Sequence, residues 1–99
     1  MWTDLSDPAI IKQLGDRIKE LRIRKGMRQE DLADKSGISL STITKIEKGK
    51  PISISLFISV LRTLGLLENL DLLIPEIGIS PIQMRQLKGK KKIRVRLKQ

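Results

Sequence analysis

The apolar residues of this chain recur mostly at helical spacing. In the first such stretch they stand three or four residues apart, as on one face of an amphipathic helix. They are Ile11, Leu14, Ile18 and Leu21. We predict a helix over residues 8–25, because Asp7 can act as its N-cap and Gly26 can end it. Residues 1–7 are then a lead-in.

Two shorter helices are predicted next, over residues 28–35 and 39–47, with a tight turn between them. Gly37 occupies the chain reversal, where glycine enters the left-handed region without a steric cost. Ser39 is a good N-cap for the second helix, because its hydroxyl can accept a hydrogen bond from a free backbone N–H. The residues expected to face inward on this pair of helices are Leu32, Ala33, Ile43 and Ile46.

Two more helices are predicted over residues 53–64 and 66–73, ended by Gly65 and Pro75. The first of them carries two apolar rows, which contain Leu56, Val60 and Leu64, and Phe57 and Leu61. The expected fold class is therefore all-α: a compact five-helix bundle with a central helix-turn-helix, in one domain of residues 8–74.

Residues 75–99 are predicted to be a linker and a basic C-terminal tail. In the last residues, apolar side chains alternate strictly with basic ones, which is typical of a strand. A single strand needs a second strand beside it, and another copy of the chain could supply one. The alternative is a disordered tail that binds phosphate groups without sequence preference. Both alternatives remain open from the sequence.

The net charge of +9 is concentrated at the C-terminus. Residues 1–84 hold twelve Lys or Arg against eleven Asp or Glu, whereas residues 85–99 hold eight Lys or Arg and no acid. A basic chain favours a polyanionic partner such as a nucleic acid. Here the tail alone makes the chain basic.

Composition excludes several classes of function. The chain has no Cys and no His, which excludes disulfides, Cys/His zinc sites and nucleophile–histidine catalysis. The carboxylates lie on amphipathic helix faces without the signature of a cleft, so we expect neither an enzyme nor a cofactor. No stretch reaches the ~20 apolar residues of a membrane span, and no signal peptide is visible. We therefore expect a cytoplasmic protein with no membrane partner.

The outward face of the helix over residues 39–47 consists of short polar side chains and one base. Such a face suits the DNA major groove, where hydrogen-bonding groups meet the edges of bases. Glu47 does not fit that role, because a carboxylate would repel phosphate. We expect Glu47 to be structural and paired with a base of the first helix, for which Arg22 is our candidate.

Nine residues of this region together resemble the helix-turn-helix of the lambda-repressor-like (Xre, Cro/CI) family. They are Gln29, Ala33, Gly37, Ile38, Ser39, Ile43, Ile46, Glu47 and Gly49. The resemblance spans residues 14–67, about half of the chain. It has one departure, since Arg28 stands where the family usually has a Thr or Ser that opens the first motif helix. Arg28 cannot cap that helix with a hydroxyl, although it could bind a phosphate directly.

The resemblance implies which residues would contact double-stranded DNA. The residues implied to read bases are Leu40, Ser41, Thr44 and Lys45. The residues implied to contact phosphates are Arg28, Gln29, Ser39, Thr42, Lys48 and Lys50. Among the first set, Lys45 can donate to guanine O6 or N7, and Leu40 can pack on a thymine methyl group. The expected function is that of a sequence-specific transcriptional regulator of bacterial or phage origin, acting as a repressor.

One such domain makes too few base contacts to select a single genomic site. Each good bidentate contact discriminates by about 1–3 kcal/mol, against roughly 10⁶–10⁹ competing sites. A homodimer on a palindromic operator solves this problem, with half-sites about one helical turn apart. A surplus of apolar residues near the end of the domain predicts a dimer or partner surface. This surface contains Ile54, Ile58, Leu66, Leu70 and Leu73.

A second hypothesis concerns a protein partner. Residues 64–92, LGLLENLDLLIPEIGISPIQMRQLKGKKK, resemble the C-terminal part of regulators that accompany HipA-type toxin kinases. This resemblance implies a HipB-like antitoxin that neutralises such a toxin and represses its own operon. It extends DNA binding and does not compete with it.

Overall fold

The structure is a computed structural model, and it describes residues 1–78 of the chain. These residues contain five α-helices and two short 3-10 helices, η1 (Trp2–Asp4) and η2 (Leu67–Asn69), and no strand. The all-α expectation is thereby confirmed. The chain divides into two compact units, and the boundary between them in the sequence follows Asn69. The predicted tail, with its two alternatives, lies outside the described residues.

The longest helix, α1 (Asp7–Arg24), begins one residue earlier than expected. Its N-cap is Ser6, whose Oγ accepts from the Ala9 backbone N–H over 3.3 Å, so the prediction of Asp7 as the N-cap is wrong. The physical reason is that a serine hydroxyl caps as well as a carboxylate, and Asp7 in the first turn then faces the positive end of the helix dipole. The lead-in forms η1, where the Arg17 guanidinium carbon lies 4.7 Å from the centre of the Trp2 ring.

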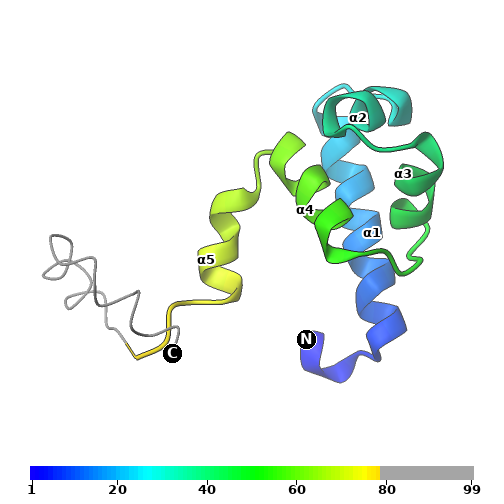
Figure 1. Ribbon diagram of the computed structural model, residues 1–99. Helices are drawn as coiled ribbons and strands as arrows, with labels where there is room; N and C mark the ends of the chain where they lie inside the picture. The colour runs from blue at the N-terminus through cyan, green and yellow to red at the C-terminus, as the bar shows by residue number, and fades with distance from the viewer. Residues whose placement is uncertain (79–99) are drawn as a thin grey trace, which may run out of the picture. The chain divides into compact units, whose positions relative to one another are not determined.

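The two motif helices are α2 (Gln29–Ser36) and α3 (Leu40–Glu47), within one residue of their predicted bounds. Gly37 follows α2 in the left-handed region with φ 70°, as expected of the turn. Ser39 caps α3, because its Oγ accepts from the Thr42 backbone N–H over 3.1 Å. Figure 1 shows α3 beside α1, with α2 above them in this view.

The core of the first unit lies where α1, α2, α3 and α4 (Ile54–Thr63) meet. All four residues predicted to face inward on the motif helices are buried. The core consists of Ile18, Leu32, Ala33, Ile43, Ile46, Val60 and Leu64. Burial of each large aliphatic side chain contributes about 1.5–3 kcal/mol, so this small cluster dominates the stability of the unit.

Leu14 differs from the prediction. It belongs to the apolar row of α1 but stays 37% exposed, at the edge of an apolar groove of 270 Å³ between α1, the α3–α4 loop and α4. The apolar row is therefore buried at Ile18, and it is more exposed at Leu14, closer to the beginning of the helix. The reason is that α3 and α4 cover only part of the length of α1.

The predicted helix over residues 66–73 is corrected to two shorter pieces. The chain forms η2 and then, in the second unit, α5 (Leu70–Leu73). In η2 the Asn69 backbone N–H bonds to the Leu66 carbonyl over 3.0 Å, which is the tighter 3-10 pattern. A two-turn helix is only marginally stable by itself, so local bonding can divide it. No helix among residues 1–78 is long and apolar enough to cross a membrane.

Candidate nucleic-acid interface

The outward face of α3 carries the side chains implied to read bases. Leu40, Ser41 and Lys45 are exposed, and Thr44 is half-buried. Ile43 and Ile46, on the opposite face of the same helix, are buried in the core. The fold therefore brings the four base-reading candidates together on one accessible surface.

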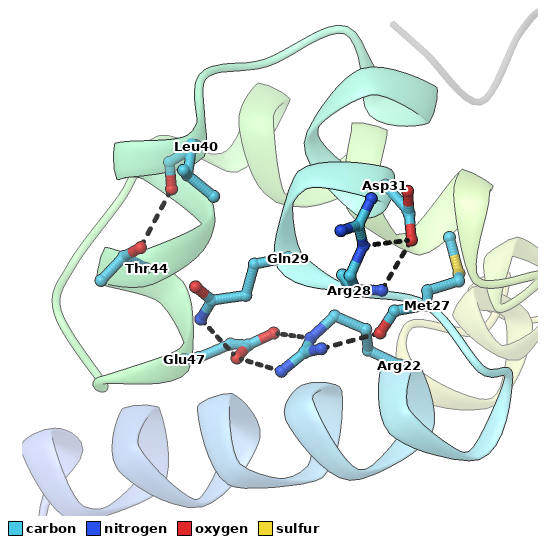
Figure 2. Close-up of polar contacts among 8 residues, drawn as sticks. All are labelled: Arg22, Met27, Arg28, Gln29, Asp31, Leu40, Thr44 and Glu47. Atoms are coloured by element: carbon cyan, nitrogen blue, oxygen red, sulfur yellow. Dashed lines mark hydrogen bonds and ion pairs between the residues drawn. The ribbon is translucent and has the colours of Figure 1, made fainter.

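The hydroxyl groups at the beginning of α3 bond mainly to one another. Ser39 Oγ lies 2.8 Å from Thr42 Oγ1 and 3.1 Å from Ser41 Oγ. One turn further on, Thr44 Oγ1 donates to the Leu40 carbonyl over 3.1 Å, as drawn in Figure 2. These bonds hold the rotamers of the surface side chains at the helix start.

A buried ion pair fixes the other end of α3 to α1. Arg22 Nε donates to Glu47 Oε2 over 2.7 Å, and Arg22 Nη2 donates to Glu47 Oε1 over 3.1 Å. Arg22 is 7% exposed and Glu47 is 6% exposed. The prediction that Glu47 is paired with Arg22 is confirmed. Because the contact is bidentate, it restrains the direction of α3 as well as its distance from α1.

Two further groups complete this buried network, which Figure 2 shows. Gln29 Nε2 donates to Glu47 Oε1 over 3.0 Å, and Arg22 Nη1 donates to the Met27 carbonyl over 2.8 Å. The network thus joins α1, the α1–α2 loop, the first residue of α2 and the last residue of α3. Gln29 is half-buried beside the N-terminus of α2, and its contact with phosphate stays a prediction.

Two glycines let α3 approach α1 closely. A Cβ atom on Gly15, which is buried within α1, would overlap the Ile46 carbonyl oxygen and lie 3.2 Å from that of Glu47. Gly49, just after α3, has φ 81°, and a Cβ there would lie 2.8 Å from Lys12 Cα. Backbone therefore packs against backbone at both positions, and any larger residue would move α3.

Arg28 and Asp31 explain how α2 starts without a hydroxyl cap. The Arg28 backbone N–H donates to Asp31 Oδ2 over 2.8 Å, which is half of a capping box. This hydrogen bond holds the pKa of the Asp31 carboxyl below its ordinary value, and the nearby Arg28 guanidinium adds to the effect. The Arg28 side chain is largely exposed, with Nε 3.7 Å from Asp31 Oδ2. The departure from the family pattern at Arg28 thus leaves the helix start intact.

Lys48 and Lys50 are exposed immediately after α3. The Lys48 backbone N–H bonds to the Thr44 carbonyl over 3.0 Å, and that of Lys50 bonds to the Lys45 carbonyl over 2.9 Å. These bonds satisfy the last carbonyls of the helix and hold the turn. Both lysine side chains therefore extend from an ordered turn, at the same end of the predicted DNA-binding face.

The residues predicted to form a dimer or partner surface have different surroundings. In the first unit, Ile54 is 75% exposed, Ile58 is half-buried, and Leu66 packs against the core. In the second unit, Leu70 is half-buried and Leu73 is 69% exposed. Further apolar side chains are exposed in that second unit, namely Leu72, Ile74 and Ile77.

Three contributors to this site were not predicted from the sequence. Asp31 is the third residue of α2, and its position was recognisable as that of the carboxylate in a capping box. Gly15 interrupts a helical pattern, which often marks close packing. The contact of Gln29 with Glu47 had no local signal, since the two residues are separated by α2, the turn and α3.

Comparison with known proteins agrees with this geometry. A family model described as Helix-turn-helix, HTH_3, matches residues 18–68, just over half of the chain. The chain therefore belongs to this family of Xre or lambda-repressor-like helix-turn-helix proteins. It is a DNA-binding transcriptional regulator by that membership.

Among solved structures, a chain of the SinR protein/SinI protein complex is similar. It shares 29% sequence identity with this chain, with a TM-score of 0.49. The match covers 82% of this chain and 96% of that chain. No curated protein sequence matches.

Proposed function

We propose that this protein is a sequence-specific repressor that binds a palindromic operator as a homodimer, with α3 of each copy in the major groove. The observation that supports this most is the asymmetry of α3. Three of its base-reading candidates, Leu40, Ser41 and Lys45, are exposed, while Glu47 at its end is paired with Arg22 of α1. The helix is therefore available to DNA and restrained by its own domain.

In this proposal each exposed group on the DNA side has a separate task. Lys45 donates to guanine O6 or N7, and among the described residues its ammonium group makes no ion pair. Arg28, Lys48 and Lys50 contact phosphates at the ends of α2 and α3, which sets the orientation of the domain. Occupation of a promoter by the dimer blocks transcription, and no catalytic step is needed.

The exposed apolar side chains of the second unit support dimerisation. Leu72, Leu73 and Ile74 follow one another and are each more than half exposed. A contiguous group of exposed apolar side chains indicates a surface that is buried in an interface with another molecule. Sedimentation of the full chain, compared with a Leu73→Asp variant, measures this directly. A monomer for both proteins contradicts the dimer.

Binding to selected DNA tests the proposed base reading. A duplex library of random sequence is enriched for binders, and the affinity for the enriched site is compared with that for scrambled DNA. Lys45→Ala is expected to weaken the enriched site about ten-fold and scrambled DNA much less, because one base contact is lost. Lys19→Ala, an exposed lysine of α1, is the control. Equal losses on both duplexes contradict base reading by Lys45.

The second candidate function is that of a HipB-like antitoxin, which would bind a kinase-like toxin in addition to DNA. The same exposed apolar residues of the second unit support it, since they suit a protein partner as well as a second copy. Purification of the tagged protein from its native cell distinguishes the two. A kinase-like protein in stoichiometric amount favours the antitoxin, and the protein alone contradicts it. In either case we expect action in the cytoplasm of a bacterial or phage-infected cell.

A further inference from the structure

The apolar groove between α1, the α3–α4 loop and α4 has no task in the proposed function. Its volume is 270 Å³, and two of the side chains that line it, Ile18 and Ile46, are buried. Leu14 and Ile54 also line it, and they are 37% and 75% exposed. Buried apolar side chains therefore form the floor of the groove, and exposed ones form its edge. A concave apolar surface with few polar groups is the usual form of a small-molecule site.

The volume of the groove limits the size of its occupant. A methylene group occupies about the volume of a water molecule, ~30 Å³ in the liquid, so the groove holds a chain of about nine carbons. A peptide helix docks through at least three anchor side chains, and three leucine side chains of four carbons each would need about 360 Å³ by the same measure. The groove therefore suits a small hydrocarbon ligand better than a helix of a protein partner.

One charged side chain lines the groove, and it is basic. Lys50 is exposed and makes no ion pair among the described residues. Among the described residues that line the groove, none is acidic. Ile54 is the first residue of α4, so the positive end of that helix dipole borders the groove as well. Both features favour a ligand with a single negative charge at one end.

We propose that the groove binds a medium-chain fatty carboxylate, with its hydrocarbon chain against Ile18 and Ile46 and its carboxylate at Lys50. In the proposed function Lys50 contacts a DNA phosphate, so the carboxylate and the phosphate compete for one ammonium group. The ligand therefore weakens DNA binding and relieves repression. This regulatory role rests on the proposed function, whereas binding of the ligand needs no DNA.

Calorimetric titration of the unaltered full-length protein with fatty carboxylates, from hexanoate to dodecanoate, tests the site. Affinity is expected to rise about four-fold for each methylene that enters the groove. The rise should stop near a length of about nine carbons, because further methylenes stay in water. Affinity that climbs without a break to dodecanoate indicates general adsorption and overturns the site, as does the absence of saturable binding.

Two pairs of variants locate the ligand. Lys50→Gln is expected to weaken octanoate about three-fold, the value of one exposed ion pair, and to leave octan-1-ol unchanged. Lys48→Gln removes the same charge outside the groove and should bind octanoate as the wild type does. Ile54→Asp, with a carboxylate at the edge of the groove, should weaken octanoate about ten-fold. Ile23→Asp, an exposed isoleucine outside the groove, should not. Equal effects within either pair overturn the inference.

DNA binding distinguishes the regulatory role from the proposed function. Saturating octanoate, at constant ionic strength, is expected to lower the magnitude of the salt dependence for the enriched site by about 0.9, the value of one phosphate contact. Lys50→Gln should show no such change. An unchanged salt dependence with octanoate bound overturns the regulatory role. Failure to enrich any sequence overturns the proposed function and the regulatory role together, and the calorimetric result then decides the binding site by itself.

Discussion

Arg22 and Glu47 are two charged side chains inside a very small core. Removing each of them from water costs several kcal/mol, so the pair alone is weak evidence for stability. The cost of burying the pair is offset because both charged groups are fully hydrogen-bonded. Beside the bidentate contact, Arg22 donates to the Met27 carbonyl and Gln29 donates to Glu47. Among the described residues, no buried side-chain polar atom lacks a hydrogen-bond partner. The network therefore specifies one orientation of α3 at a cost that its hydrogen bonds offset.

Glu47→Gln is expected to destabilise the protein by about 3 kcal/mol, because Arg22 would keep its buried charge without a counter-ion. Urea unfolding measures the change. Glu30→Gln, the same substitution at an exposed position of α2, should change the free energy of unfolding by less than about 0.5 kcal/mol. The ratio of affinities for enriched and scrambled DNA should persist in the fraction that stays folded. Equal free energies of unfolding for Glu47→Gln and Glu30→Gln would show that the ion pair does not stabilise the fold.

Asp31 makes the stability of the folded protein depend on pH in the acidic range. Its carboxyl has a lowered pKa in the folded protein, chiefly through the Arg28 backbone N–H. A lowered folded-state pKa contributes stability that is present above the unfolded pKa, about 4 for an aspartate, and is lost as the pH falls through the folded value.

Asp31→Asn removes this titration. We expect the difference in unfolding free energy between wild type and variant to be constant above about pH 5 and to shrink below about pH 4. Urea unfolding at a series of pH values measures it. Asp34→Asn, on an exposed part of the same helix, is the matched control. A difference that grows on acidification would reverse the sign and contradict the capping role.

At the scale of elements, the position of α3 depends on close approach to α1. Side-chain packing alone keeps helix axes about 8–10 Å apart, and a glycine in the contact allows the shorter end of that range. Gly15 of α1 lies against the last carbonyls of α3, and Gly49, in the turn that follows α3, lies against Lys12 of α1. The ion pair to Arg22 and the two glycines therefore act on the same end of α3, leaving its beginning free for DNA.

Gly15→Ala is expected to destabilise the protein by about 1–2 kcal/mol. Overpacking against Ile46 and Glu47 costs about 1–3 kcal/mol, of which the higher helix propensity of alanine recovers up to about 1 kcal/mol. DNA affinity should also fall, since α3 must shift. Lys19→Ala in the same helix is the control for an alanine at an exposed position. A more stable Gly15→Ala protein would mean that α1 and α3 separate at no cost.

At the scale of the whole molecule, charge and the predicted reading surface belong to different parts of the chain. Residues 1–84 are nearly neutral, and residues 85–99 carry eight Lys or Arg. Phosphate contacts without sequence preference account for most of the salt dependence of DNA binding. We therefore expect affinity to come largely from the tail and specificity from α3.

A full-length variant with Lys90, Lys91 and Lys92 changed to Gln separates these contributions. The slope of the logarithm of the binding constant against the logarithm of salt concentration is negative. Its magnitude should decrease by as much as about 2.7, or about 0.9 for each lysine that contacts a phosphate. The preference for the enriched site should be unchanged. Lys19, Lys35 and Arg62 changed to Gln provide a control of equal charge. Equal slopes for the two variants would contradict a special role of the tail.

Local sequence was sufficient for most of the elements. The helix-turn-helix was predictable within one residue at each end, because Gly37, Ser39 and the spacing of Leu32, Ala33, Ile43 and Ile46 act over a few residues. The pairing of Glu47 with Arg22 was also predictable, from the argument that a carboxylate would not face phosphate. The division of residues 66–73 into η2 and α5 was not predicted, because a helix of two turns is only marginally stable by itself. The Ser6 cap was not predicted, because Ser6 and Asp7 are both good N-cap residues.

Sequence by itself determined which residues form each motif helix, which face of it is apolar, and the family to which the chain belongs. Only the tertiary structure decided how α3 is held. Gln29 meets Glu47, and Gly15 meets the backbone of Ile46, because separate helices fold onto one another. The physical reason is range: capping and periodicity act within a turn or two, whereas buried hydrogen bonds and backbone contacts depend on where distant segments of the chain lie.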